Sequence, residues 1–296
     1  MHIRKVLYVL PLLVSVSLTG GCAAKIAKMS VDSMKPIMVE MRNATNKNRD
    51  AQLILDAMPA MLVQMDGFIG VSPENRYLLT SAAEANMGYA FLTVEDKDKG
   101  RAKFLYLKAR DYALRNLMLN KTFRKAYEGG DIEEFTRALN TIHKRDVGPL
   151  YLATNSWMMW INLAHADEPA ALKDLPRVEA MMDRVLVLDD THYYGGVHAL
   201  LGTYYVARPE MFGGQPEDAK AHFQEAFDIS ESKYLLWHYL YARYYAVYVK
   251  DRELFVSTLN KIIAAPPDIL PEETFANAAV KKKASSLLLQ VDDYFR

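Results

Sequence analysis

The chain of 296 residues has little cysteine, glycine and proline, and it has no net charge. A single cysteine excludes an internal disulfide and any zinc cluster built from cysteines. The chain has 14 glycines and 12 prolines. Their combined share of the residues is below the usual roughly 12%, which argues against a loop-rich all-β protein. Basic and acidic residues balance at 36 each. Nucleic-acid-binding proteins usually carry a basic excess, so we expect no nucleic-acid partner.

The chain is rich in apolar residues that favour helices. Hydrophobic residues make up 51% of it, which is enough for a sizeable core. Ala, Leu and Met far outnumber the β-branched Val, Ile and Thr, and this ratio favours helix over strand. The composition therefore predicts an all-α protein.

The N-terminus has the pattern of a bacterial secretion signal. Arg4 and Lys5 precede an apolar run over 6–18, which is too short to span a bilayer. Thr19-Gly20-Gly21 then leads into Cys22, the only cysteine. This segment resembles the lipobox of bacterial lipoproteins, in which the chain is cut before the cysteine and the thiol is acylated. The alternative is an ordinary secretory signal followed by an incidental thiol.

The lipobox divides the chain into three parts. We expect a signal peptide over 1–21, an anchor and N-terminal linker over 22–48, and a helical domain over 49–296. Acyl chains on Cys22 would hold the protein on a lipid bilayer, and Ala23, in place of Asp, indicates the outer membrane. No later stretch reads as the roughly 18 apolar residues of a transmembrane helix, so the rest is expected to lie in the periplasm.

Helix-start signals recur along the domain. A proline followed by an acidic residue suits the first turn of a helix, where no backbone hydrogen bond is lost and the carboxylate faces the positive end of the helix dipole. Asp131 and Glu134 have the spacing of a capping box. The proline-acid starts are Ser72-Pro73-Glu74, Gln215-Pro216-Glu217 and Leu270-Pro271-Glu272.

An internal repeat resembles the tetratricopeptide (TPR) pattern of paired helices. Leu201-Gly202 with Tyr205 gives the first helix of the pattern, and Ala219, Phe223 and Ala226 give the second. Small residues at these positions let two helices approach closely. Three weaker copies follow the same spacing, at Met87-Gly88/Phe91 with Ala102/Tyr106/Ala109, at 157–163 with Val178/Met182/Val185, and at Tyr241-Ala242/Tyr245 with Phe255/Leu259/Ile262.

These copies predict stacked antiparallel helical hairpins, a TPR-like α-solenoid. An apolar stripe running from Ala276 to Phe295 reads as a capping helix. Lys281 to Lys283 are expected to face solvent on that helix.

A set of motifs resembles one family. The motifs are the lipobox, Trp157-x-x-Trp160, Gly195-Gly196-x-His198-x-Leu200-Leu201-Gly202, Gly213-Gly214, Pro216-Glu217 and His222-Phe223. Together they are similar to the TatT family, the T component associated with tripartite ATP-independent periplasmic (TRAP) transporters. The resemblance implies a helical lipoprotein that associates with the solute-binding subunit of such a transporter. It also implies a homo-trimer, with a pore or cleft that passes an apolar organic acid.

Several clusters are candidates for ligand contact. Trp237, Tyr241, Tyr244, Tyr245 and Tyr248 share one side of a helix and could line an aromatic channel or simply pack between helices. Arg243 could clamp a carboxylate or lie at the surface. Trp157 and Trp160 could pack in the core or touch a ligand.

Within the family resemblance, we expect the partner surface at Tyr193, Tyr194 and the turn from Arg208 through Phe212 and Gly213 to Gly214. This turn is longer than a hairpin requires, and long ordered loops commonly contact partners. The simpler alternative is that the glycine pair only ends one helix and directs the next.

Catalytic and metal sites are not indicated. Asp189, Asp190 and His192 form the densest group of possible metal ligands, but they also read as a plain turn. No zinc-protease, nucleophile-elbow or phosphate-loop motif occurs, so we expect neither an enzyme nor a cofactor. A general TPR scaffold lipoprotein for envelope assembly remains the alternative function, and a helical glycan-cleaving enzyme is the third.

Overall fold

The protein is an assembly of helices, as its composition predicts. The computed structural model describes residues 22–207 and 214–295, and no strand occurs in that part of the chain. Residues 22–33 are helical as well. The α-helices are α2 (Lys35–Asn46), α3 (Ala51–Val71), α4 (Arg76–Tyr89), α5 (Lys99–Leu117), α6 (Lys121–Gly129), α7 (Ile132–Leu139), α8 (Val147–Ala164), α9 (Leu175–Asp189), α10 (His192–Tyr205), α11 (Pro216–Ile229), α12 (Leu235–Leu240), α13 (Arg252–Ala264), α14 (Thr274–Leu288) and α15 (Val291–Tyr294).

Short helical segments of other types join these helices. Two π-helical turns continue α4 and α12, and 3₁₀ turns precede α8, α9 and α14. The π turns are η1 (Ala90–Val94) and η5 (Tyr241–Ala246), and the 3₁₀ turns are η2 (Lys144–Asp146), η3 (Pro169–Asp174), η6 (Pro267–Ile269) and η7 (Pro271–Glu273).

Consecutive helices pack together as hairpins. The pairs α4–α5, α8–α9 and α10–α11 are in contact, and α13 packs on both η5 and α14. A Cβ on Gly202 would lie 2.7 Å from the Phe223 ring, and Phe223 is fully buried. The small residue in the TPR-like motif therefore allows α10 and α11 to approach closely.

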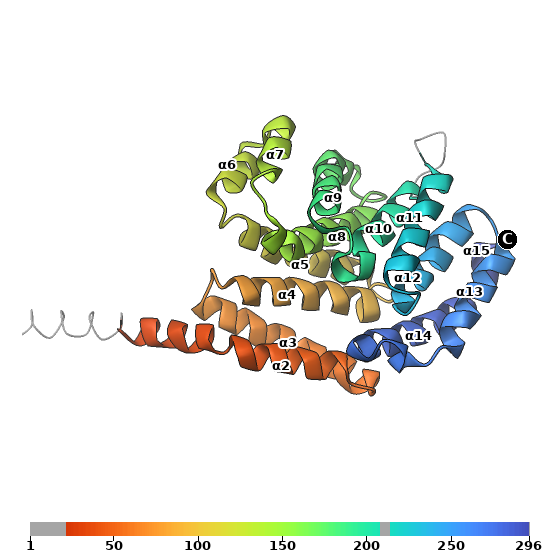
Figure 1. Ribbon diagram of the computed structural model, residues 1–296, viewed down its shortest axis with the longest axis horizontal. Coiled ribbons are helices and arrows are strands. Elements are labelled where there is room, and N and C mark those ends of the chain that lie inside the picture. Colours follow the sequence, from red (N-terminus) through yellow and green to blue (C-terminus); the bar gives the residue numbers. More distant parts are fainter. Residues whose placement is uncertain (1–21, 208–213, 296) are drawn as a thin grey trace, which may run out of the picture.

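The two ends of the described chain meet. Helix α14 packs against both α2 and α3 (Figure 1). Arg49 forms an ion pair with Asp268 at 2.7 Å. Lys283, near the C-terminus, reaches Asp96 and the carbonyl oxygen of Phe91. The N-terminal helices thus close against the C-terminal ones.

Three expectations from the sequence need correction. Lys283 is buried instead of facing solvent, because its ammonium group is satisfied by Asp96 and the Phe91 carbonyl. Helix α4 begins at Arg76, because the Asn75 side chain caps it by accepting from the Leu78 N–H. The expectation that no later stretch could span a bilayer is also wrong by length and composition, because α3 is long and apolar enough to cross a membrane.

The segment 22–48, expected as an anchor and linker, is helical over most of its length. Asp32 accepts hydrogen bonds from the Ser72 hydroxyl (2.6 Å) and the Asn75 amide (2.7 Å). These bonds join the N-terminal helix to the turn between α3 and α4. They also lower the pKa of Asp32 to about 2, together with the Lys28 ammonium, which has the largest effect.

Candidate functional site

A cavity of about 330 Å³ lies between the N-terminal helices and the C-terminal ones. Its wall is formed by residues of α2, α3, α4, α5, α8, α10, α12 and α14 and of the turns η1 and η7. Small-molecule sites commonly occupy about 300–1,000 Å³, so the cavity can hold a small ligand. Met41 and Arg42 of α2 and Gln64 of α3 line it and are also exposed, which places the solvent-exposed part of its wall at these two helices.

Methionine dominates this wall. Eight of the chain's 15 methionines line the cavity, and their unbranched thioether side chains adapt to different apolar shapes. Three come from α2 and its preceding turn, three from α3, and one each from α4 and α8: Met34, Met38, Met41, Met58, Met61, Met65, Met87 and Met159.

One side of the cavity is aromatic. Tyr193, Tyr234 and Trp237 meet edge to face, with ring centroids 5.8 Å apart for the two tyrosines and 4.9 Å for Tyr234 and Trp237. Tyr151 continues this wall, 5.7 Å from Tyr193. Burial raises the pKa of Tyr193 and of Tyr234 well above the usual value, so both phenols stay neutral.

A left-handed turn places Tyr193 in this wall. Tyr193, Tyr194 and Gly195 have φ values of 52°, 59° and 77°, a region that costs a non-glycine residue roughly 1–2 kcal/mol. The Trp237 indole N–H donates to the Tyr194 carbonyl at 2.8 Å, and the Tyr194 ring stacks on Tyr234 at 5.1 Å. A glycine is favoured at 195, because its φ is 77° and a Cβ there would lie 3.0 Å from Ile229 Cδ1 and 3.3 Å from the Ala226 Cα.

The cavity also has a charged part. Arg42 and Glu84 form an ion pair at 3.4 Å. Glu273 is 9% exposed and lines the same cavity. Burial, reinforced by the Glu84 carboxylate, raises the pKa of Glu273 to about 7, and Arg42 opposes this change. Glu273 is therefore partly protonated near neutral pH.

The comparisons with known proteins identify the family. A family model described as the TRAP transporter T-component matches residues 47–295, which is most of the chain. The chain belongs to the TRAP transporter T-component family. It is also 24% identical over 262 residues to an uncharacterized protein of Treponema pallidum (strain Nichols), an alignment that covers 83% of this chain and 80% of the relative. The T component is an accessory transporter protein, and its family is not an enzyme family.

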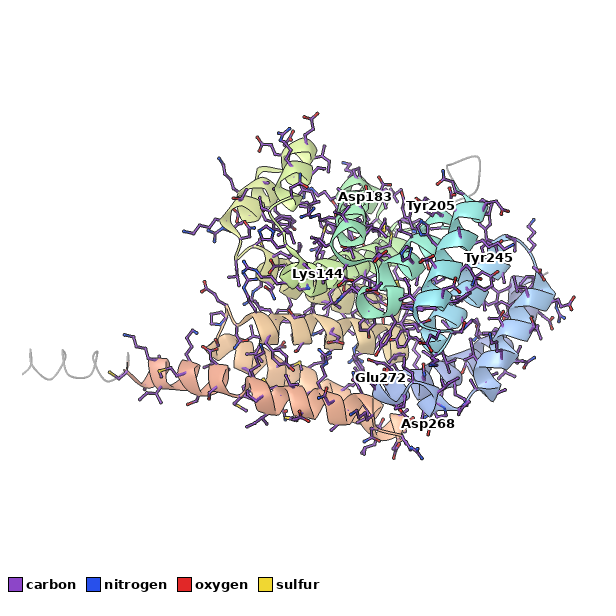
Figure 2. All side chains as sticks on the ribbon, viewed as in Figure 1. Lys144, Asp183, Tyr205, Tyr245, Asp268 and Glu272 are labelled. Carbon is purple, nitrogen blue, oxygen red and sulfur yellow. The ribbon has the colours of Figure 1, made fainter. Side chains whose placement is uncertain are left out.

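The structure of this T component divides the aromatic candidates between the cavity and the packed core. Trp237 lines the cavity. Tyr241 and Tyr245 stack on each other at 4.8 Å, and Tyr241 contacts the rings of Phe223 and Phe227. These two tyrosines therefore pack against α11, and Figure 2 labels Tyr245 in that region.

The other candidates lie outside the cavity wall. Trp157 is 2% exposed and donates to Asp174 at 3.0 Å, so it packs in the core. Trp160 and Trp157 both lie beneath the guanidinium of Arg110. Arg243 lies over the Tyr294 ring at 4.7 Å.

The predicted partner surface is only partly described. Tyr193 lines the cavity, and Tyr194 stacks beside it. Arg208, Phe212 and Gly213 lie outside the described residues, and Gly214 is the first described residue after them. Cys22 is exposed.

No group of three or more possible metal ligands occurs within 22–207 and 214–295. Asp189 accepts from Thr191 and pairs with Lys144 at 3.2 Å. Asp189 and its neighbours therefore read as a turn.

Sequence reasoning missed the N-terminal part of the cavity. Residues 34, 38 and 41, and again 58, 61 and 65, are methionines at helical spacing. This stripe of methionines on two neighbouring helices was the available signal. The sequence carries no such signal for Glu273, because the place of this residue in the cavity depends on contacts with α2 and α4.

Proposed function

We propose that this T component is a lipid-anchored accessory protein of a TRAP transporter that docks the solute-binding subunit and passes an apolar ligand to it. The observation that carries the proposal is the methionine-lined cavity. Apolar cavities with a few polar groups are the usual form of small-molecule sites. The family membership supplies the transporter context.

Exposed apolar side chains on the N-terminal helices support protein contact. Ile37, Leu53 and Val63 are 59%, 58% and 70% exposed. Each of these side chains leaves apolar surface that contact with a protein partner would bury. We assign such contacts to the binding subunit or to a homo-trimer, with the Tyr193–Tyr194 turn and the 208–214 connection as further contact points. The TPR-like hairpins would form the scaffold of this docking surface.

Crosslinking in intact cells, followed by capture of this protein, tests the docking. We expect a TRAP solute-binding subunit among the captured proteins. Repeated capture of outer-membrane or peptidoglycan machinery without that subunit would instead support a general scaffold lipoprotein.

A cavity-filling variant tests the ligand. Ala85 lines the cavity, so Ala85→Phe should abolish the small molecules that mass spectrometry detects in the purified protein, while capture of the binding subunit persists. Val187→Phe places the same aromatic side chain at a residue that is 75% exposed and should change neither.

Cys22 is the proposed lipid attachment point. It would hold the protein in the periplasm, on the outer membrane. Cys22→Ser should move the protein from the outer-membrane fraction to the soluble periplasmic fraction, since the acyl chains would be lost. Retention of the variant on the membrane would contradict the lipid anchor.

A further inference from the structure

The charged part of the cavity carries more negative than positive charge. Arg42, Glu84 and Glu273 are the charged residues of its described wall. Arg42 is engaged by Glu84 at 3.4 Å. Glu273 is more than nine-tenths buried, and its carboxylate has no hydrogen-bond or ion-pair partner within the described part of the chain. A buried, unpaired carboxylate is unfavourable, and a ligand of opposite charge would offset that cost.

The aromatic wall lies beside this carboxylate. Glu273 interacts electrostatically with Tyr193 and Tyr234, and both rings line the same cavity together with Trp237. Glu272, the neighbour of Glu273, is labelled in Figure 2 near the start of α14. The faces of tyrosine and tryptophan rings attract cations, most strongly when the cation is removed from water.

We propose that the cavity binds amphipathic molecules with a positively charged end, such as alkylammonium ions, and that Glu273 and the aromatic wall recognise this end. The apolar tail would lie among the methionines. A carboxylate ligand would add a third negative group beside Glu84 and Glu273, and pairing it with Arg42 would leave Glu84 without its cation. The inference rests on the proposed ligand-passing function and specifies the class of ligand.

The preference should depend on pH. Deprotonation of Glu273 increases the negative charge of the cavity, so binding of a cation strengthens as pH rises through the pKa of about 7, and binding of an anion weakens. Charged and titratable groups surround this carboxylate on α2, α4, α10, on its own turn and just before α12: Arg42, Glu84, Tyr193, Tyr194, Glu272 and Tyr234.

Binding of three probes with the same tail tests the inference. The probes are octyltrimethylammonium, octanol and octanoate, added to the full chain in lipid nanodiscs, with empty nanodiscs as the blank. Trp237 is the one of the three tryptophans that lines the cavity, so its fluorescence reports occupancy and Trp237→Phe identifies its signal. At about pH 8 we expect octyltrimethylammonium to bind at least about tenfold more tightly than octanoate, a preference that shrinks at about pH 6.

Glu273→Gln should reduce the tenfold preference to near unity, while octanol binding is unchanged. Glu272→Gln removes the same charge from an exposed neighbouring position outside the cavity wall and should leave most of the preference in place, because Glu272 has the smallest effect on the pKa of Glu273. Tighter binding of octanoate, or an unchanged preference in Glu273→Gln, would overturn the inference about charge and leave the ligand-binding cavity standing. Absence of binding by all three probes would overturn both.

Discussion

Gly202 lies where α10 crosses α11, and the Phe223 ring fills the space that a side chain would need. Gly202→Ala should lower the free energy of unfolding by about 1–3 kcal/mol, because a buried aromatic ring must move. Urea denaturation measures the loss. Gly67→Ala is the matched control, since a Cβ there meets nothing within 4 Å, and it should be neutral or stabilising. Equal effects of the two substitutions would contradict this account of the crossing.

Glu273 should make stability depend on pH. Its pKa is about 7 in the folded protein against an ordinary value of 4.5. The contribution of the protonated Glu273 carboxyl to the free energy of unfolding is therefore fully present below about pH 4.5. It is lost as pH rises through about 7. Glutamine does not ionise, so Glu273→Gln avoids this loss. Relative to the wild type, the free energy of unfolding of the variant should rise by on the order of 3 kcal/mol between about pH 5 and pH 8. Thermal or urea unfolding at both pH values measures the gain, and Glu272→Gln should show none.

Single residues were predictable from sequence where their partners lie nearby in the chain. Gly202 and Phe223 belong to one hairpin, so the repeat motif was enough to pair them. Lys283 and Asp96 are separated by most of the domain, and apolar periodicity alone gave no reason to bury a lysine. The position of Glu273 likewise depends on α2 and α4, which come much earlier in the chain.

Helix boundaries were predictable from the sequence where a capping side chain or a proline at the helix start determines them. Helix α11 begins at Pro216 as expected, and the Asp131 side chain accepts from the Glu134 N–H at the start of α7. The Pro271 start became a 3₁₀ turn before α14. The left-handed turn at Tyr193–Gly195 was hidden, because tyrosine rarely adopts positive φ and tertiary contacts hold it there, namely the surrounding rings and the Trp237 hydrogen bond to the Tyr194 carbonyl.

Lys283 links α14 to the π turn η1 through a hydrogen bond. Its ammonium contacts Asp96 at 2.5 Å and the Phe91 carbonyl at 2.9 Å, and it lies over the Phe91 ring. Lys283→Ala should cost about 1–3 kcal/mol, because the Phe91 carbonyl and the Asp96 carboxylate lose their partner. Thermal unfolding checks this loss. Lys282→Ala, at the exposed neighbouring position, should stay within about 0.5 kcal/mol of the wild type.

At the scale of the whole molecule, contacts between the ends distinguish the chain from an open repeat array. In open solenoids each repeat contacts only its neighbours, whereas here α2 and α3 pack on α14. We expect one urea transition, with far-ultraviolet circular dichroism and tryptophan fluorescence coinciding. Separate midpoints for the two signals would show that the contacts between the ends contribute little to cooperativity.

The eight methionines that line the cavity also make it chemically vulnerable. A thioether is readily oxidised to a sulfoxide, which is polar and chiral. Met41 is 56% exposed at the α2 wall and would react before the less exposed methionines beside it. Each oxygen added would convert part of an apolar wall into a hydrogen-bond acceptor, so oxidants would weaken the proposed ligand binding without unfolding the protein. Methionine sulfoxide reductase would then be the enzyme that restores the cavity.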